Sequence, residues 1–169
     1  KIVAYDPKPN AELMPTYGVE YLELEKLLES SDVITIHVPY LPATHHLLNK
    51  TNMQKIKKGA VLINTARGGL IETDALITAL QTGRLSGAAL DVLEEEGLVQ
   101  EEMHILEHGH PNQEQLRVVL EDHLLMGMDN VLITPHTAFQ TREAIYRILD
   151  TTVENILQFA DGKPQNVVS

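Results

Sequence analysis

Charged side chains follow closely after several short apolar runs in this sequence of 169 residues. They are Asp6, Arg67, Asp91, the triplet Glu94-Glu95-Glu96 and His136. If the apolar runs form parallel strands, their carboxyl ends meet at one edge of a sheet, where open α/β sheets bind their ligands. The sequence therefore predicts a site that brings an arginine, a histidine and carboxylates together.

Arg67, Glu96 and His136 have the chemistry needed to act on an organic acid. Arg67 precedes two glycines, which let a ligand approach closely, and its planar guanidinium can hold a carboxylate through two parallel hydrogen bonds. A carboxylate beside an imidazole favours the protonated ring, which can exchange a proton with a substrate hydroxyl. We therefore expect Arg67 to anchor a carboxylate and Glu96 to keep His136 charged as an acid/base.

The elements that must position these groups alternate between strand and helix. Runs rich in β-branched residues predict strands at Lys1–Tyr5, Val33–Val38, Ala60–Asn64, Gly87–Val92 and Val131–Thr134. Helical spacing predicts helices at Leu22–Glu29, Asn52–Ile56, Thr73–Thr82, Gln113–Met126 and, from Thr141, a long helix that Gly162 and Pro164 end. Because parallel strands need a crossover, usually a helix, this alternation predicts an α/β fold with a doubly wound parallel sheet.

The composition narrows the expected partners. The chain has 13 basic and 24 acidic residues, a formal net charge of −11, which repels phosphate backbones and anionic lipid heads. No apolar run approaches the roughly 20 residues that a membrane-spanning helix needs. The lack of cysteine excludes disulfides and thiolate metal sites. We therefore expect a cytoplasmic protein that binds neither nucleic acid nor a membrane.

Asp6 ends the first predicted strand and precedes a Pro-Lys-Pro turn. Dinucleotide-binding folds place an acid at this position to accept hydrogen bonds from the adenosine ribose, and its charge repels a 2′-phosphate, so NAD is expected rather than NADP. The glycine fingerprint G-x-G-x-x-G is absent from the sequence. Since that fingerprint precedes the acid by about 20 residues, we expect it upstream of Lys1, in a longer polypeptide.

A resemblance to a known family rests on four stretches in chain order, SSDVITIHVPYLPATHHLLN, GAVLINTARGGLIETDAL, GRLSGAALDVLEEE and NVLITPHTAF. They resemble the NAD-dependent D-2-hydroxyacid dehydrogenases, and the last is more similar to the D-lactate dehydrogenase branch. The resemblance implies an oxidoreductase that passes a hydride between NAD and a small D-2-hydroxy acid or 2-keto acid. D-lactate and pyruvate are the expected pair, and a homodimer is the expected assembly.

The resemblance also implies roles for individual residues. Arg67 would anchor the substrate carboxylate and carbonyl, and His136 would donate the proton in reduction. Glu96 would be the partner of His136, although the residues alone leave Glu95 open. The residues expected to bind the cofactor are Asp6, Val38, Pro39, Thr44, Thr65, Ala66, Arg67 and Asp91, and Phe139 is expected to close the substrate pocket.

The same resemblance divides the chain into two parts. Residues 1–138 would form a partial dinucleotide-binding domain, with residues 97–129 as an insertion or long loop. Residues 139–169 would form a C-terminal helix that returns to a substrate domain. Most residues that select the substrate side chain would then lie outside this sequence.

Two alternatives compete with the dehydrogenase interpretation. His104, Glu107 and His108 match the pattern H-x-x-E-H, in which two histidines on one helical face bind zinc and the glutamate activates water, as in a zinc-dependent hydrolase. Gly109 and Pro111 follow at once and would end the helix that such a motif needs. A non-catalytic nucleotide-binding module would keep Asp6 without needing Arg67, Glu96 and His136 together.

Overall fold

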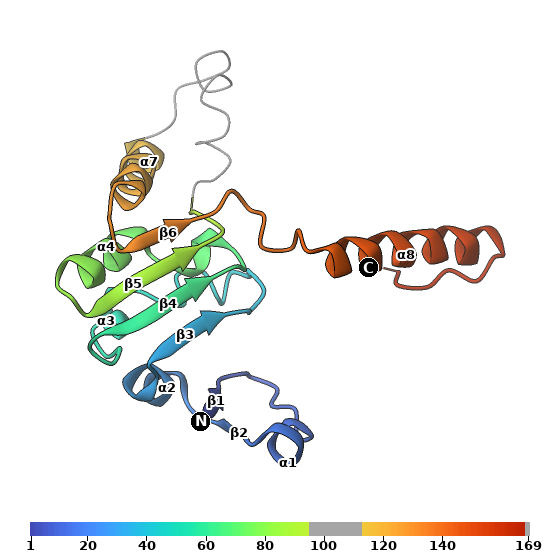
Figure 1. The fold of residues 1–169 in the computed structure, drawn as a ribbon, viewed down its shortest axis with the longest axis horizontal. Coiled ribbons are helices and arrows are strands. Elements are labelled where there is room, and N and C mark those ends of the chain that lie inside the picture. Colours follow the sequence, from blue (N-terminus) through green and yellow to red (C-terminus); the bar gives the residue numbers. More distant parts are fainter. Residues whose placement is uncertain (95–112, 168–169) are drawn as a thin grey trace. The chain divides into compact units, whose positions relative to one another are not determined.

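The computed structural model describes residues 1–94 and 113–167. The chain divides into two compact units, Lys1–Pro135 and His136–Ser169 (Figure 1). The boundary follows Pro135, a little before the boundary after residue 138 that the sequence predicts. The first unit holds all the strands of the described chain, and the second holds one long helix.

The strands of the first unit form two parallel sheets. The smaller sheet pairs β1 (Ile2–Ala4) with β2 (Val19–Tyr21). The larger has the order β3-β4-β5-β6, with bounds Val33–Ile36, Ala60–Asn64, Leu85–Leu90 and Val131–Ile133 (Figure 1). Every pair is parallel, so the predicted parallel α/β architecture is confirmed.

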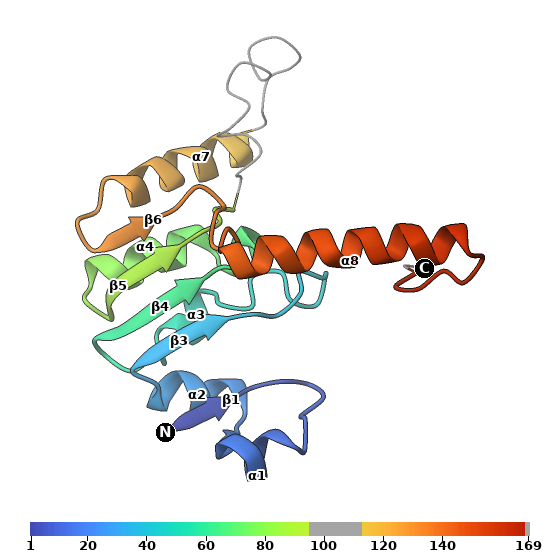
Figure 2. The ribbon, with the colours of Figure 1, turned by 45° about the vertical axis from the view of Figure 1, so that its right-hand side comes forward.

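Helices pack against one face of the larger sheet. They are α2 (Leu24–Ser30), α3 (Lys50–Met53), α4 (Thr73–Gln81) and α7 (Gln113–Met126). Alternate strand residues that share a register, such as Ile34, Leu62 and Ala88, form the buried core with Leu28 and Leu125 from these helices. Figures 1 and 2 show α3 and α4 behind the strands. The period of two along each strand thus selects the side chains that meet the helices.

The opposite face of the larger sheet is open in the first unit. Val33 on β3 and Leu132 on β6 are 58% and 63% exposed, and Val61 and Ile63 of β4 are only half-buried. Parallel sheets are almost always covered on both faces, which is why their strands are apolar throughout. This apolar face therefore lacks a covering layer among the described residues of its own unit.

Two short elements of the structure are not expected from the sequence. They are helix α1 (Leu13–Tyr17), which has five residues, and strand β2, which has three. Segments this short show no hydrophobic periodicity from which a helix or a strand could be predicted. Gly18 joins them in the left-handed conformation, with φ 67°. The helix predicted at Gln113–Met126, within the stretch 97–129 that is also predicted as an insertion or long loop, is observed with the same bounds as α7, the crossover helix from β5 to β6 (Figure 2). Residues 95–112 lie outside the described chain.

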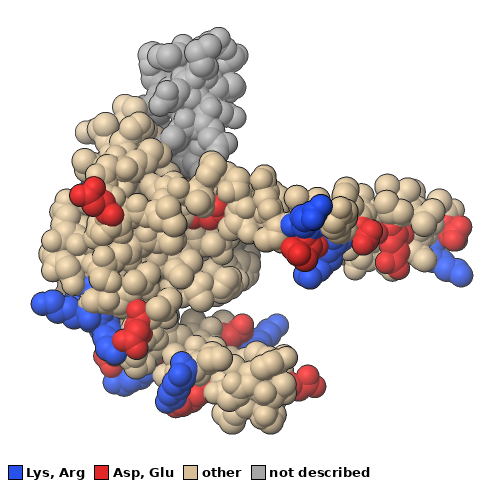
Figure 3. All heavy atoms as spheres, viewed as in Figure 1, with Lys and Arg blue, Asp and Glu red and all other residues tan. Residues whose placement is uncertain are grey.

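The second unit consists mainly of α8 (Arg142–Ala160). Its N-cap is Thr141, whose hydroxyl oxygen accepts a hydrogen bond of 3.1 Å from the Ala144 N–H. Figure 3 shows acidic and basic side chains along this helix. Four apolar side chains at helical spacing are 42% to 62% exposed, namely Ile145, Leu149, Val153 and Ile156. Among the described helices, none has both the length and the apolar character that a bilayer crossing needs.

Asp74, in the first turn of α4, joins three helices through ion pairs. Its Oδ2 lies 2.7 Å from Lys50 Nζ of α3 and 2.9 Å from Arg117 Nη2 of α7. The hydrogen bond from Lys50 is the main reason that the pKa of Asp74 lies below its ordinary value, and the charges of Lys50 and Arg117 lower it further. The ionised carboxylate of Asp74 therefore stabilises the packing of the three helices.

We expect Asp74→Asn to lower the free energy of unfolding near neutral pH by about 1 kcal/mol, because ion pairs of this exposure contribute at most about that much. A depressed folded pKa gives stability that is present above the unfolded pKa and is lost as pH falls through the folded pKa. Urea unfolding measured from neutral to acid pH should therefore show that the free energies of unfolding of the parent and of Asp74→Asn converge. The exposed Glu154→Gln serves as the control, and a difference that persists in strong acid would contradict the assignment.

Candidate active site at the carboxyl edge of the sheet

The carboxyl ends of the four strands lie level with one another. Ile36 pairs in register with Asn64, Asn64 with Leu90, and Leu90 with Ile133. The segments that follow these strands therefore leave the sheet at one edge (Figure 1). Arg67 and Asp91 are both on these segments, which is where ligands bind in open parallel sheets.

Asn64 shapes the loop that carries Arg67. Its side chain is fully buried, and its Oδ1 accepts a hydrogen bond of 3.0 Å from the Ala66 N–H. Its Nδ2 donates to the Arg67 carbonyl oxygen at 2.9 Å. The Arg67 side chain itself is exposed. Asn64 is not among the site residues that the sequence predicts, although an amide at the end of an apolar strand is a usable signal.

The Arg67 loop, residues 65–70, is packed tightly on both sides. A Cβ added at Gly68 would lie 1.8 Å from the Leu93 carbonyl oxygen, and one added at Gly69 would lie 2.8 Å from the ring of Tyr40. The two glycines are therefore needed because neighbouring groups occupy the space of a side chain. Gly68–Leu70 form a short 3-10 turn in which the Ile71 N–H donates to the Gly68 carbonyl oxygen.

Glu94, the first residue of the acidic triplet, is held by three donors. One carboxylate oxygen lies 2.5 Å from His46 Nε2, and the other accepts hydrogen bonds from the Thr73 hydroxyl at 2.6 Å and the Thr73 N–H at 3.2 Å. The Glu94 side chain is 13% exposed. His46 also stacks on His45, with ring centroids 3.7 Å apart. Glu94 thus joins the segments after β3, β4 and β5.

Asp91 lies at the end of β5 and is 3% exposed. Its Oδ1 accepts a hydrogen bond of 2.5 Å from the Thr134 hydroxyl, and its N–H donates to the Asn64 carbonyl oxygen at 2.9 Å. A buried carboxylate needs such partners, because its desolvation is costly. The predicted role of Asp91 toward the cofactor stays a prediction.

The other predicted cofactor residues lie on three loops of the first unit, after β1, β3 and β4. Asp6 is exposed after β1, and its Oδ1 accepts a hydrogen bond of 2.7 Å from the Lys8 N–H. The Thr44 hydroxyl donates to the Pro39 carbonyl oxygen at 2.7 Å and accepts from the Leu41 N–H at 2.8 Å. Thr44 therefore shapes its own loop. Half-buried Val38 lies on that loop, and Thr65 and Ala66 begin the Arg67 loop.

The meeting of Arg67, Glu96 and His136 stays a prediction. Glu96 lies outside the described residues, as do His104, Glu107 and His108 of the zinc alternative. His136 is the first residue of the second unit, where it adopts a left-handed conformation with φ 52°. Phe139, three residues later, is 50% exposed. Within residues 1–94 and 113–167, no group of three acidic or histidine side chains is arranged to hold a metal ion.

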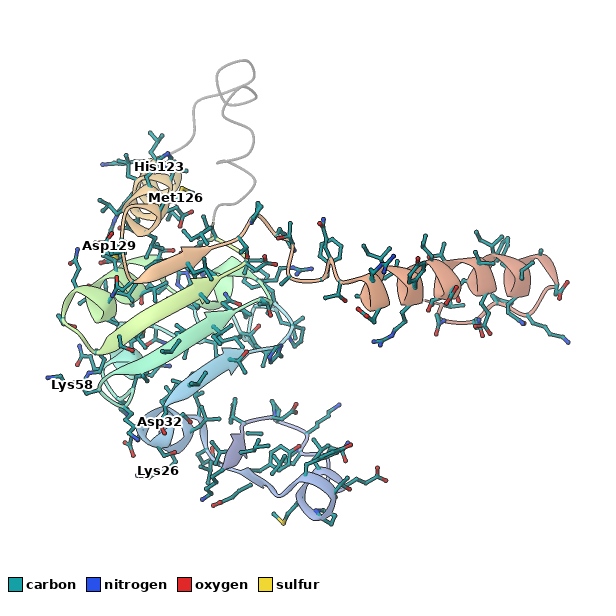
Figure 4. All side chains as sticks on the ribbon, in the orientation of Figure 1. Lys26, Asp32, Lys58, His123, Met126 and Asp129 are labelled. Atoms are coloured by element: carbon teal, nitrogen blue, oxygen red, sulfur yellow. The ribbon has the colours of Figure 1, made fainter. Side chains whose placement is uncertain are left out.

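The charged side chains at the amino-terminal edge of the sheet are exposed to solvent. Lys26, Asp32 and Lys58, labelled in Figure 4, lie on this side of the first unit, and Lys26 and Asp32 each form an exposed ion pair. Asp32 is 82% exposed and lies 2.6 Å from Lys57 Nζ, whose hydrogen bond lowers the pKa of Asp32. Pairs of this kind are screened by water and are poor candidates for binding a ligand. At the carboxyl edge, by contrast, Asn64, Thr73 and Asp91 are buried polar residues.

Comparison with known proteins identifies related chains. Residues 1–138 match the family described as D-isomer specific 2-hydroxyacid dehydrogenase, NAD binding domain. The D-lactate dehydrogenase kk1H of Curvularia clavata is 38% identical over 97% of this chain and 44% of its own length. The 2-hydroxyacid dehydrogenase A of Aspergillus oryzae is 43% identical over 94% of this chain and 43% of its own length. This chain therefore spans less than half the length of these relatives.

A solved structure has the same fold. The D-lactate dehydrogenase of Aquifex aeolicus, crystallised with NAD and lactic acid, superposes with a TM-score of 0.80 and 38% identity over 96% of this chain and 47% of that chain. Relatives named for other substrates are also similar. A glyoxylate reductase of Aeropyrum pernix is 36% identical over 100% of this chain and 44% of its own length.

The packing of Gly68 gives a direct test of the loop. We expect Gly68→Ala to lower the free energy of unfolding by about 1 to 3 kcal/mol, because the new methyl group overlaps backbone atoms that must shift. Gly127→Ala is the control, since its Cβ would meet its nearest atom at an ordinary 3.5 Å. Urea unfolding of both variants measures the effect, and equal stability of the two would contradict the close packing.

Proposed function

This chain belongs to the D-isomer-specific 2-hydroxyacid dehydrogenases, and we propose that its protein interconverts a small 2-keto acid and the D-2-hydroxy acid, with pyruvate and D-lactate as the pair. Two similar proteins are named as D-lactate dehydrogenases, and a third as a glyoxylate reductase. All three names refer to small acids of this chemical class. The proposal concerns the whole polypeptide, of which this chain is less than half by comparison with its relatives.

The observation that carries the proposal is the placement of Arg67. Its backbone is held by Asn64, its loop is fixed between Leu93 and Tyr40, and its side chain is exposed at the carboxyl edge. A guanidinium presented on a rigid loop can bind a carboxylate in a defined orientation. Arg67 would thereby align the 2-keto acid and polarise its carbonyl oxygen.

The proton chemistry is assigned to His136. In reduction, protonated His136 would donate its proton to the carbonyl oxygen as negative charge develops there, and in oxidation it would accept the proton from the hydroxyl. Glu96 is proposed to hold the imidazole in its protonated form. Bound NAD supplies or accepts the hydride.

Residues of this chain suit the cofactor at two places. Asp6 offers an exposed carboxylate after β1, where an acid binds the ribose hydroxyls in dinucleotide folds. Asp91, with Thr65 and Ala66 on the neighbouring loop, would face the nicotinamide side. The classification of residues 1–138 as an NAD-binding domain supports this assignment. We also retain the homodimer, the cytoplasmic location and the return of α8 to a substrate domain as parts of the proposal.

The strand orders of the two sheets support the proposal that the dinucleotide fold has one further strand between them. The observed orders are β2-β1 and β3-β4-β5-β6. In the doubly wound order 3-2-1-4-5-6, the first strand lies between the second and the fourth, and its turn carries the glycine fingerprint. In this chain, β1 would correspond to the second strand of that order and β3 to the fourth. The strand with the glycine-rich turn would therefore lie between them in the complete protein.

Steady-state oxidation of NADH with pyruvate by the intact protein tests the two roles. His136→Ala should lower kcat by about 10²- to 10⁴-fold, the range for a lost general acid. Arg67→Ala should lower kcat/KM by about 10²- to 10³-fold, through lost electrostatic stabilisation. The controls His123→Ala on α7 and Arg84→Ala, the residue just before β5, should retain activity. Full turnover by either site variant, or loss of turnover on adding a chelator, would refute the assignment.

Asp6 provides an independent test of the cofactor. Asp6→Ser should raise the KM for NADH by roughly tenfold, about the effect of one hydrogen bond to a charged group, and should improve the use of NADPH by removing a repulsive charge. Kinetics with both cofactors measure the change. Asp32→Ser, at the other edge of the sheet, is the matched control. An unchanged preference between NADH and NADPH would count against Asp6 as the ribose acid.

A further inference from the structure

We propose that Glu94 is a positioning residue that fixes the Arg67 loop for binding the substrate carboxylate. This inference rests on the function proposed for Arg67. Glu94 is distinct from Glu96, the residue proposed as the partner of His136. Its described contacts are with His46 and Thr73, so it would act on the reaction only through the loop.

One wall of the Arg67 loop is the segment that carries Glu94. The backbone of Gly68 lies so close to the peptide between Leu93 and Glu94 that a Cβ would come within 2.4 Å of the Glu94 nitrogen. A displacement of this peptide by a fraction of an ångström would therefore open or crowd the loop next to Arg67. The position of Glu94 sets the position of this wall.

The other wall is the segment that carries His46. The His46 N–H donates to the Gly69 carbonyl oxygen at 2.9 Å, and the Leu48 N–H donates to the Leu70 carbonyl oxygen at 3.0 Å. The Arg67 loop is thus hydrogen-bonded along its second half to this segment. The contact between His46 and Glu94 connects the two walls across the loop.

Thr73 supplies the third fixed point. It is the first residue of α4, and its N–H is one of the donors that a helix leaves unsatisfied at its N-terminus. The Glu94 carboxylate accepts from this N–H and from the Thr73 hydroxyl, and it also benefits from the positive end of the helix dipole. The walls are therefore anchored to a buried helix, since Thr73 is 5% exposed.

The conformation of His46 supports a positioning role. Its φ of 49° is in the left-handed region, which only a few per cent of non-glycine residues adopt, histidine more often than most. Strained backbone of this kind persists only where surrounding contacts hold it, and it is concentrated at functional sites. The hydrogen bonds of the His46 N–H and Nε2 with Gly69 and Glu94 hold it here.

The kinetic test separates positioning from a general structural role. Glu94→Ala in the intact protein should raise the KM for pyruvate roughly tenfold, which is the effect of losing one well-oriented interaction, while the KM for NADH changes by less than about twofold. Glu94→Gln keeps an oxygen for Thr73 and should lie between Glu94→Ala and the parent. Glu72→Ala, at the N-cap of the same helix, is the matched control and should retain the KM of the parent.

A double-mutant cycle tests whether Glu94 acts through Arg67. In an Arg67→Lys background, which keeps a positive charge, Glu94→Ala should change kcat/KM for pyruvate by less than about twofold, because the oriented guanidinium is already gone. A full tenfold loss in both backgrounds would overturn the proposal. If Arg67→Lys itself has no effect, the proposed function of Arg67 fails instead, so the two failures are distinguishable.

Amide hydrogen exchange gives a readout that needs neither cofactor nor turnover. Without NAD, Glu94→Ala should speed exchange at the Leu70 and Ile71 amides roughly tenfold, whereas Glu72→Ala should not. These amides donate within the Arg67 loop. If Glu94→Ala does not fold, the same measurement on Glu94→Gln decides the question. Unchanged exchange in a folded Glu94 variant would overturn the proposal.

Discussion

The contact between Gly68 and the backbone of Leu93 is the constraint on which the candidate site depends. No side chain fits between these segments, so the loop after β4 and the segment after β5 must pack as bare backbone. This contact places Arg67 next to the end of β5, where buried Asp91 lies. Asn64 adds a second constraint, because its amide satisfies two backbone groups of the same loop. The exposed guanidinium is thus carried by a backbone with little freedom to move.

The sheet that supports this loop is covered unevenly. Helices bury one face, whereas the face with Val33 and Leu132 is open within the first unit. An apolar open face is unusual for a complete domain, because parallel sheets are buried on both faces. The share of its relatives that this chain spans, 43% to 44% for two of them, agrees with the need for further layers.

The charged side chains at the two edges of the sheet differ in their exposure to solvent. At the amino-terminal edge, Asp32 and Lys57 form a pair that is largely solvated and therefore contributes little. At the carboxyl edge, Asp91 is buried, Glu94 is partly buried, and both are hydrogen-bonded, so their loss would leave donors without acceptors. Buried polar groups of this kind specify one arrangement of the loops, which explains how a surface arginine can be held in a defined place.

The alternation of strands and helices, the parallel sheet, and the positions of Arg67 and Asp91 at strand ends can all be predicted from the sequence, because these features follow from local periodicity. The sequence does not reveal α1, β2, the structural role of Asn64, or the junction of Glu94 with His46 and Thr73. His46 and Glu94 are 48 residues apart, and nothing in either local pattern indicates the other. The inward orientation of Glu94 is seen only in the folded structure, since register and close packing arise when distant segments share one sheet edge.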